Sequence, residues 1–88
     1  MKLHPDMLIH KNGDEEILIA TGELSKTFHK VLKLNSTAAL IVHWLEEERS
    51  EEELLKLFIA EYPDEDPTRL KQDLSEILDQ LNSLHVLI

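Results

Sequence analysis

KVLKLNSTAALIVHWLEEE, residues 30–48, joins a strand pattern directly to a helix pattern. Over residues 28–34, apolar and polar side chains alternate with a period of two, which predicts a strand. Val31 makes the alternation imperfect, because it is apolar on the otherwise polar face. Asn35-Ser36-Thr37 then stops the strand, since each of these side chains accepts a hydrogen bond from a free N–H in a first helical turn.

The helix that follows is predicted to run to about Glu47. Its apolar residues recur at i, i+3, i+4 and i+7 and form one face: Ala38, Ile41, Val42 and Leu45. Trp44 is interpreted as a residue that closes the core beside Leu45, the alternative being a contact residue for a partner protein.

A hairpin is predicted before this stretch. Residues 7–10 and 17–21 are short runs rich in Ile and Leu, and KNGDEE lies between them. Asn12-Gly13 is a strong reverse-turn signal, because both residues tolerate a positive φ. Gly22 breaks the second run, so two strands are expected here, joined by a turn at Asn12-Gly13.

Two further helices are predicted, each with its own start signal. Ser50 and Glu53 have the spacing of a capping box, and Pro63 ends this helix. Asp66-Pro67 supplies a capping acid and a proline at the first position of a helix that runs to about Leu84. The apolar residues at helical spacing are Leu54, Leu55, Phe58 and Tyr62 in the first of these helices, and Leu70, Leu74, Ile77, Leu78, Leu81 and Leu84 in the second. The apolar tail HVLI, residues 85–88, is expected to pack back on the domain.

The order of elements is therefore three strands followed by three helices. This predicts an α+β domain with a three-stranded antiparallel sheet, similar to a winged helix-turn-helix. The 88 residues suffice for one domain, 1–88, with a modest core. The chain has no cysteine and no apolar run of the roughly 20 residues that a membrane span needs, so a soluble, cytoplasmic protein without disulfides is expected.

Most of the acidic surplus lies in one segment. The formal net charge is −9, and residues 46–66 hold ten acidic and two basic side chains, a net −8. Residues 24–45, by contrast, carry Lys26, Lys30 and Lys33 and no acid. Affinity for DNA comes largely from Lys and Arg that neutralise phosphates, so the acidic second and third helices argue against DNA binding despite the fold.

No constellation of residues indicates catalysis or a bound metal. None of the five histidines pairs with another at i+3 or i+4, and there is no cysteine to complete a metal site. The sequence has no nucleophile motif and no glycine-rich phosphate loop. We therefore expect no enzyme activity, no metal and no cofactor.

LNSTAALIVHWL, followed by SEEELLKLFIAEYP and LKQDLSEILDQLNSLHVLI, resembles the PqqD-like family over about residues 13–88. The shared pattern is Leu-Asn before an apolar helix, a Ser-Glu-Glu helix start, a Tyr before a loop, and Asp-apolar in a leucine-rich helix with an apolar tail. The residues at matching places are Leu34, Asn35, Ser50, Glu53, Tyr62, Asp73 and Leu74. Glu46 to Glu48 depart from the family, which often has an Asp-Gly turn there, so the resemblance does not predict the conformation of this turn.

The resemblance implies a non-catalytic recognition element for ribosomally synthesised and post-translationally modified peptides (RiPPs), similar to the stand-alone copies of lasso-peptide clusters. Such domains bind the leader of a precursor peptide and present it to a leader peptidase and an ATP-dependent cyclase. The leader adds as a strand to the edge of the third strand and lies against the third helix. The residues expected to bind it are Lys30, Val31, Leu32, Lys33, Leu70, Asp73, Leu74, Ile77 and Leu81.

The residues agree with this expectation, because an edge strand offers unpaired N–H and C=O groups to a peptide. Lys30 and Lys33 flank the edge, so the leader is expected to carry acids. The alternative function is that of an acidic winged-helix protein that regulates transcription through protein partners. Spacing alone leaves open which leucines of the third helix are core and which line a groove, and the leader sequence, the modification class and the oligomeric state are open as well.

Overall fold

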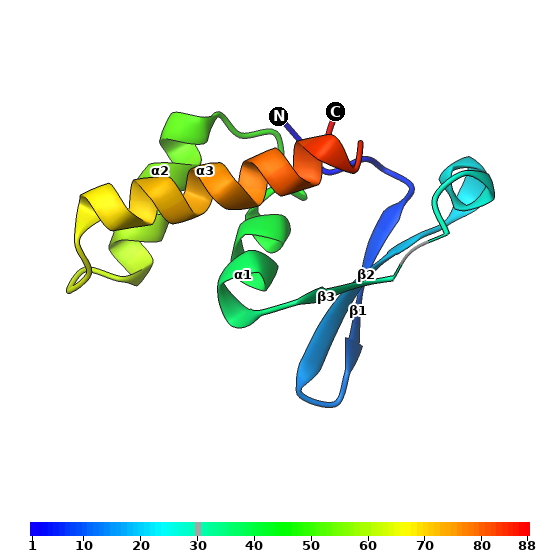
Figure 1. The fold of residues 1–88 in the computed structure, drawn as a ribbon, viewed down its shortest axis with the longest axis horizontal. Coiled ribbons are helices and arrows are strands. Elements are labelled where there is room, and N and C mark those ends of the chain that lie inside the picture. The colour runs from blue at the N-terminus through cyan, green and yellow to red at the C-terminus, as the bar shows by residue number, and fades with distance from the viewer. Residues whose placement is uncertain (30) are drawn as a thin grey trace.

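The computed structural model describes residues 1–29 and 31–88 (Figure 1). Three strands are followed by helices, with a short 3-10 helix between the second and third strands. The elements are β1 Met7–Asn12, β2 Glu15–Ala20, η1 Gly22–Lys26, β3 Leu32–Leu34, α1 Ser36–Trp44, α2 Glu51–Glu61 and α3 Pro67–Ser83. The described residues measure 41 × 28 × 19 Å along their principal axes.

The hairpin is confirmed, and it is longer than the sequence indicated. β1 pairs antiparallel with β2 from Met7 opposite Ala20 to Asn12 opposite Glu15, so that only Gly13 and Asp14 form the loop. Gly13 has a φ of +65°, a left-handed conformation that glycine adopts without strain. The sheet order is β1-β2-β3, which makes β2 the central strand and β3 an edge strand.

The third strand begins later than predicted, because Phe28 belongs to the turn that follows η1. The N–H groups of Thr27 and Phe28 both donate to the Leu24 carbonyl, at 3.2 Å and 2.9 Å. These residues therefore close the turn after η1 instead of pairing with β2. Among the described residues of the predicted strand, 28–34, only Leu32–Leu34 form a strand, and residue 30 lies outside the described residues.

The three predicted helix starts are confirmed by their caps. The Asn35 side chain accepts from the Ala38 N–H at 2.8 Å, and Asp66 accepts from the Thr68 N–H at 3.0 Å. Ser50 and Glu53 form the capping box, with bonds of 3.1 Å and 3.0 Å. These local bonds satisfy N–H groups that have no partner inside a helix.

The first helix ends at Trp44, three residues earlier than predicted. The N–H groups of Glu46 and Glu47 donate to carbonyls only three residues back, which tightens the chain out of the α-helix. Arg49 Nε donates to the Trp44 carbonyl at 2.8 Å and so satisfies one of the carbonyls at the helix end. Trp44 itself is half-buried against the core, in edge-to-face contact with Phe58 at 6.4 Å between ring centroids.

The core lies between the sheet and the helices, and the two chain ends close it on one side. The buried apolar side chains form one cluster: Leu3, Met7, Leu18, Ile41, Val42, Leu45, Leu54, Phe58, Leu70, Leu74, Leu78, Leu81 and Val86. Leu3 forms a β-bridge with Leu87, and Val86 is fully buried, which confirms that the apolar tail packs back. Both ends lie close together in Figure 1. Among the described residues, no helix is both long and apolar enough to cross a bilayer.

Candidate functional site

The outer edge of β3 is the part of the sheet that offers backbone groups to a partner. β3 pairs with β2 on one side, and in the described residues no strand lies on its other side. Leu32 and Leu34 pack against the core, so Lys33 between them points to the opposite face, where it is exposed. Val31, just before the strand, is 61% exposed. A strand edge of this kind presents unpaired N–H and C=O groups in a row.

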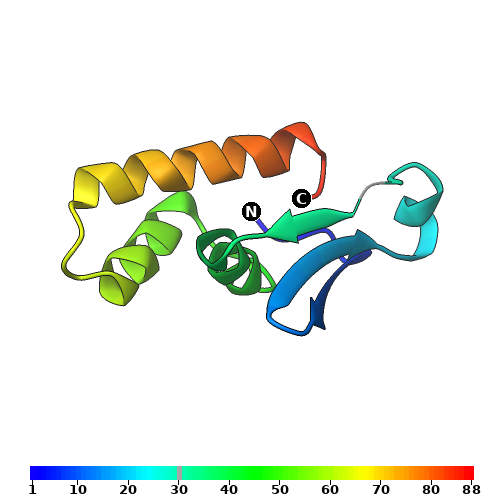
Figure 2. The same ribbon diagram turned by 60° about the horizontal axis from the view of Figure 1, so that its bottom comes forward.

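α3 supplies the other side of the candidate site. Both ribbon views show α3 and β3 running in opposite chain directions on the same side of the molecule (Figures 1 and 2). A cavity of about 330 Å³, which we call the cleft, opens between the residues that follow β3 and the middle of α3. Its lining residues are Asn35 and Thr37 on one wall, and Asp73, Glu76, Ile77 and Gln80 on the other.

Two further cavities continue the cleft along α3. A smaller one, of about 180 Å³, shares Thr37 and Asp73 with the cleft and extends it to Tyr62 and Arg69 near the start of α3. A larger one, of about 430 Å³, lies near the end of α3, and we call it the apolar cavity. It is lined by Leu24, Thr27, Phe28, His29, Ser83, Leu84 and His85. The three openings therefore follow α3 along most of its length.

The structure divides the residues that were predicted to bind a peptide into an accessible and a buried group. Lys30 lies outside the described residues. Val31 and Lys33 are exposed, Leu32 is half-buried, and Asp73 and Ile77 are half-buried in the wall of the cleft. Leu70, Leu74 and Leu81, which are 4%, 1% and 5% exposed, belong to the core, although Leu70 also borders the smaller cavity. The accessible wall of α3 is thus a narrow strip beside the leucine stripe.

The residues predicted from the sequence did not include all of those that line the accessible wall of α3. Glu76 and Gln80 lie three residues after Asp73 and Ile77, so helical periodicity from those two positions could have found them. Leu24 and Phe28 could not have been found in this way, because they reach the apolar cavity through η1, an element that the sequence pattern did not predict.

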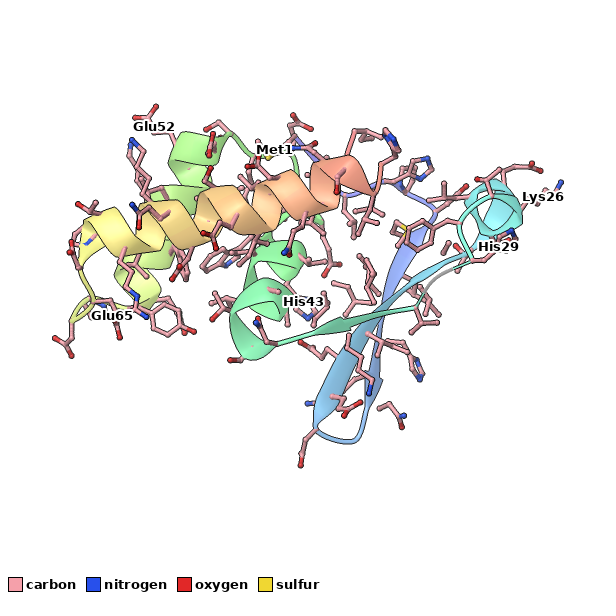
Figure 3. All side chains as sticks on the ribbon, in the orientation of Figure 1. Met1, Lys26, His29, His43, Glu52 and Glu65 are labelled. Atoms are coloured by element: carbon pink, nitrogen blue, oxygen red, sulfur yellow. The ribbon has the colours of Figure 1, made fainter. Side chains whose placement is uncertain are left out.

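Charges are distributed unevenly over the molecule. Glu52 and Glu65 lie toward the end that α2 and the start of α3 form, and Lys26 and His29 lie at the opposite end (Figure 3). Inside the cleft, Asp73 and Glu76 are carboxylates that make no salt bridge with another described residue. A peptide in the cleft therefore meets negative charge on the α3 wall, and meets the Lys33 ammonium on the outer face of β3.

His43 joins α1 to the sheet beside this site (Figure 3). Its Nε2 lies 2.9 Å from Glu16 Oε1 on β2, and its Nδ1 lies 2.8 Å from Glu46 Oε1. Both ring nitrogens donate to a carboxylate only when the imidazole is protonated. The hydrogen bond with Glu16 raises the pKa of His43 above its ordinary value of 6.5, partial burial opposes this, and the bond with Glu46 adds to it.

The arrangement is suited to binding. Within residues 1–29 and 31–88, no group of three His, Cys, Asp or Glu side chains is placed to hold a metal ion. Next to the open backbone edge of β3, the cleft combines the apolar side chain of Ile77 with the carboxylates of Asp73 and Glu76. These features fit an extended peptide, which pairs through its backbone and is distinguished by its alternate side chains.

Comparison with known proteins supports this description of the fold. Residues 7–87 match the family described as Coenzyme PQQ synthesis protein D (PqqD). The fold is similar to that of a solved chain described as TbiB1 in complex with the TbiA(beta) leader peptide, with a TM-score of 0.79 and 24% sequence identity. The similarity covers 99% of this chain and 94% of that chain, and it confirms the α+β fold of a three-stranded antiparallel sheet followed by three helices. No curated protein matches the sequence.

Proposed function

The chain belongs to the PqqD family, and on that premise we propose that it is a RiPP recognition element that binds the leader of a precursor peptide. The observation that carries the proposal is the unpaired edge of β3, which faces α3 with cavities beside both ends of the strand. The solved structure of similar fold contains a leader peptide, as its description states, which supports the same class of ligand here.

The length of the site sets the size of the bound segment. From Arg69 in the smaller cavity to His85 in the apolar cavity, α3 and its cap rise about 24 Å at 1.5 Å per residue. An extended peptide covers this length with about seven residues at ~3.3 Å each. A leader footprint of this size has three or four side chains facing the cleft and the others facing away.

The alternation of β3 indicates the charges that a bound leader carries. Side chains of an added strand that lie beside Leu32 and Leu34 point toward α3, where they meet Ile77, Asp73 and Glu76. Apolar or hydrogen-bond-donating residues suit these positions. Side chains that lie beside Lys33 point to the outer face, and acids suit those positions. The sequence predicted a leader that carries acids. We propose acids only at the alternate leader positions that lie beside Lys33.

The resemblance to stand-alone recognition elements of lasso-peptide clusters supports a finer proposal. We propose that the protein catalyses no reaction itself and delivers a lasso-type precursor to a leader peptidase and an ATP-dependent cyclase. The absence of a metal cluster among the described residues agrees with a binding role without establishing it. Separate enzymes are then needed to cut the leader and close the ring.

Calorimetry with synthetic leader peptides tests the proposal. The peptides are those of short precursor genes beside the gene for this chain, and the protein variants are Lys33→Glu and Ile77→Ala. The matched control is Lys71→Glu, which makes the same charge change on α3 beside Leu74 and outside the cleft. We expect the parent and the control to bind alike, Ile77→Ala to bind much more weakly, and Lys33→Glu to bind modestly more weakly with a flatter salt dependence. Binding by folded Lys33→Glu and Ile77→Ala variants as tight as that of the parent would show that the leader binds elsewhere.

A further inference from the structure

The apolar cavity is not explained by strand addition, because it lies beyond the start of β3. Its lining includes the large apolar side chains of Leu24, Phe28 and Leu84, all partly buried against the core. No Asp, Glu, Lys or Arg is among its lining residues in the described chain. Its volume of about 430 Å³ falls within the ~300–1,000 Å³ that is typical of sites for small ligands.

One wall of the apolar cavity is held by a turn anchored on Asp6. The Asp6 carbonyl accepts from the backbone N–H and the hydroxyl of Thr21, at 2.6 Å and 2.8 Å, and its carboxylate accepts from the Leu24 N–H at 3.3 Å. Gly22 has a φ of +54°, and a Cβ there would lie 3.3 Å from the Asp6 carboxylate. The Phe28 N–H donates to the Leu24 carbonyl at 2.9 Å. Leu24 and Phe28 are therefore fixed relative to each other.

The other wall is held by the cap of α3. His85 has a φ of +59°, and its N–H donates to the Asn82 carbonyl at 3.0 Å. The Val86 N–H donates to the Leu81 carbonyl at 3.3 Å, and the Val86 side chain is fully buried. This reversal fixes Leu84 at the mouth of the cavity. Both walls are thus formed before any ligand binds, which lowers the ordering cost of binding.

The apolar cavity continues the proposed peptide path. The cleft opens beside Asn35 at the end of β3, and the apolar cavity opens beside His29 before its start. The far walls of both openings are successive parts of α3 and its cap. Phe28 and Leu32 are four positions apart in the sequence, so at most about 13 Å separates them. A peptide that leaves the β3 edge toward the start of the strand therefore meets the apolar cavity within about four residues.

We propose that the apolar cavity binds one bulky apolar side chain of the leader, from a residue outside the segment that pairs with β3. This inference rests on the proposed leader-binding function. A charged side chain is disfavoured there, because the described lining residues include no Asp, Glu, Lys or Arg to pair with a desolvated charge. The polar rim of Thr27, Ser83 and the two histidines leaves room for the peptide backbone, whose groups need hydrogen-bond partners.

The test fills the cavity from each wall in turn. Ser83→Trp and Thr27→Trp place an indole at exposed positions on opposite walls, and Ser75→Trp makes the same change at an exposed position of α3 outside the cavities described above. A display library of random peptides, long enough to span all three cavities, is selected against the folded parent. One selected peptide and its alanine variants are then measured by fluorescence anisotropy on these four proteins and on Ile77→Ala.

We expect the selected peptides to share a bulky apolar residue at a fixed distance outside the paired segment. Its replacement by alanine should weaken binding to the parent and to Ser75→Trp about 10- to 100-fold, and should have little effect on the two filled variants. If peptides bind in an Ile77-dependent manner but show no such residue, or if filling changes nothing, the anchor site is wrong and the proposed function stands. If no peptide binds the folded parent, both are overturned. If filling instead changes the sedimentation of the protein alone, a second copy occupies the cavity and the proposal fails.

Discussion

Truncating two neighbouring side chains of α3, Leu74→Ala and Ile77→Ala, separates the core from the cleft. Both belong to the apolar stripe of the helix, but Leu74 is 1% exposed in the core, whereas Ile77 is half-buried in the cleft wall. The first variant should therefore lose mainly stability and the second mainly leader affinity. Gln72→Ala, at an exposed position of the same helix, is the control, with an expected change within about 0.5 kcal/mol.

The magnitudes follow from burial. Leu→Ala at a fully buried site costs about 2–5 kcal/mol, through the lost transfer energy and the cavity left behind. A chain of this length has a total stability of about 4–13 kcal/mol at ~0.05–0.15 kcal/mol per residue. Leu74→Ala thus removes a large share of it. Ile77 is partly exposed in the cleft wall, so Ile77→Ala should cost less than Leu74→Ala, roughly 1–2 kcal/mol.

Urea unfolding followed by the fluorescence of Trp44 measures both losses, because Trp44 is the only tryptophan and packs on Phe58. Leader affinity is then measured at a temperature at which each variant is folded by circular dichroism. We expect Ile77→Ala to bind at least about 10-fold more weakly than the parent, and Leu74→Ala to bind within about 3-fold of it. Equal losses of stability in the two variants, or parent-like leader affinity in Ile77→Ala, would refute the assignment of Leu74 to the core and Ile77 to the cleft.

Three further outcomes are expected. The stability that His43 contributes should be present below pH 6.5 and lost as the pH rises through its raised folded-state pKa, because the bond with Glu16 stabilises the protonated ring. His43→Gln should thus be less stable than the parent by about 0.5–1 kcal/mol at about pH 5.5 and equal to it at about pH 9; urea titrations that find a constant difference contradict this. The protein should not bind duplex DNA at physiological salt, since residues 46–66 carry a net charge of −8, and a sequence-selective gel shift below micromolar concentration would overturn the charge argument. Incubation of the protein with a precursor peptide should leave the peptide mass unchanged, and cleavage without a partner enzyme would disprove the non-catalytic role.

Local signals predicted much of the fold, because the interactions behind them lie within a few residues of each other. The caps of all three helices involve side chains two or three residues from the N–H group that they accept. The predicted start of β3 was wrong, because it depends on a contact between residues that are far apart in the sequence. The alternation from Phe28 suits a strand, but the preceding turn is held by Asp6, which lies far away in the sequence. The end of α1 depended in the same way on Arg49, beyond the helix itself.

The location of the candidate site was expected from the family resemblance, and helical spacing indicated only part of its residues. The edge position of β3 in the observed strand order agrees with that expectation. Spacing could not divide the α3 stripe, because Leu74 and Ile77 both suit an apolar face and only the packing of α2 and α1 decides which is covered. The apolar cavity could not be predicted from the sequence, because it lies between η1 and the cap of α3, in which His85 has a positive φ.

The shortness of β3 explains why an open strand edge and a row of cavities occur together. A long unpaired edge pairs with other copies of a protein and promotes aggregation, whereas a three-residue strand offers only about two to four hydrogen bonds to a partner. At a net ~0.5–1.5 kcal/mol each, these bonds contribute roughly 1–6 kcal/mol, and ordering a disordered peptide costs about 2–5 kcal/mol or more. Backbone pairing alone therefore leaves little net affinity. Two or three anchored side chains at ~1.5–3 kcal/mol each are needed for micromolar binding, which requires about 8 kcal/mol. In the proposed function, a leader has to satisfy both the edge and the cavities, and this joint requirement would distinguish it from other extended chains.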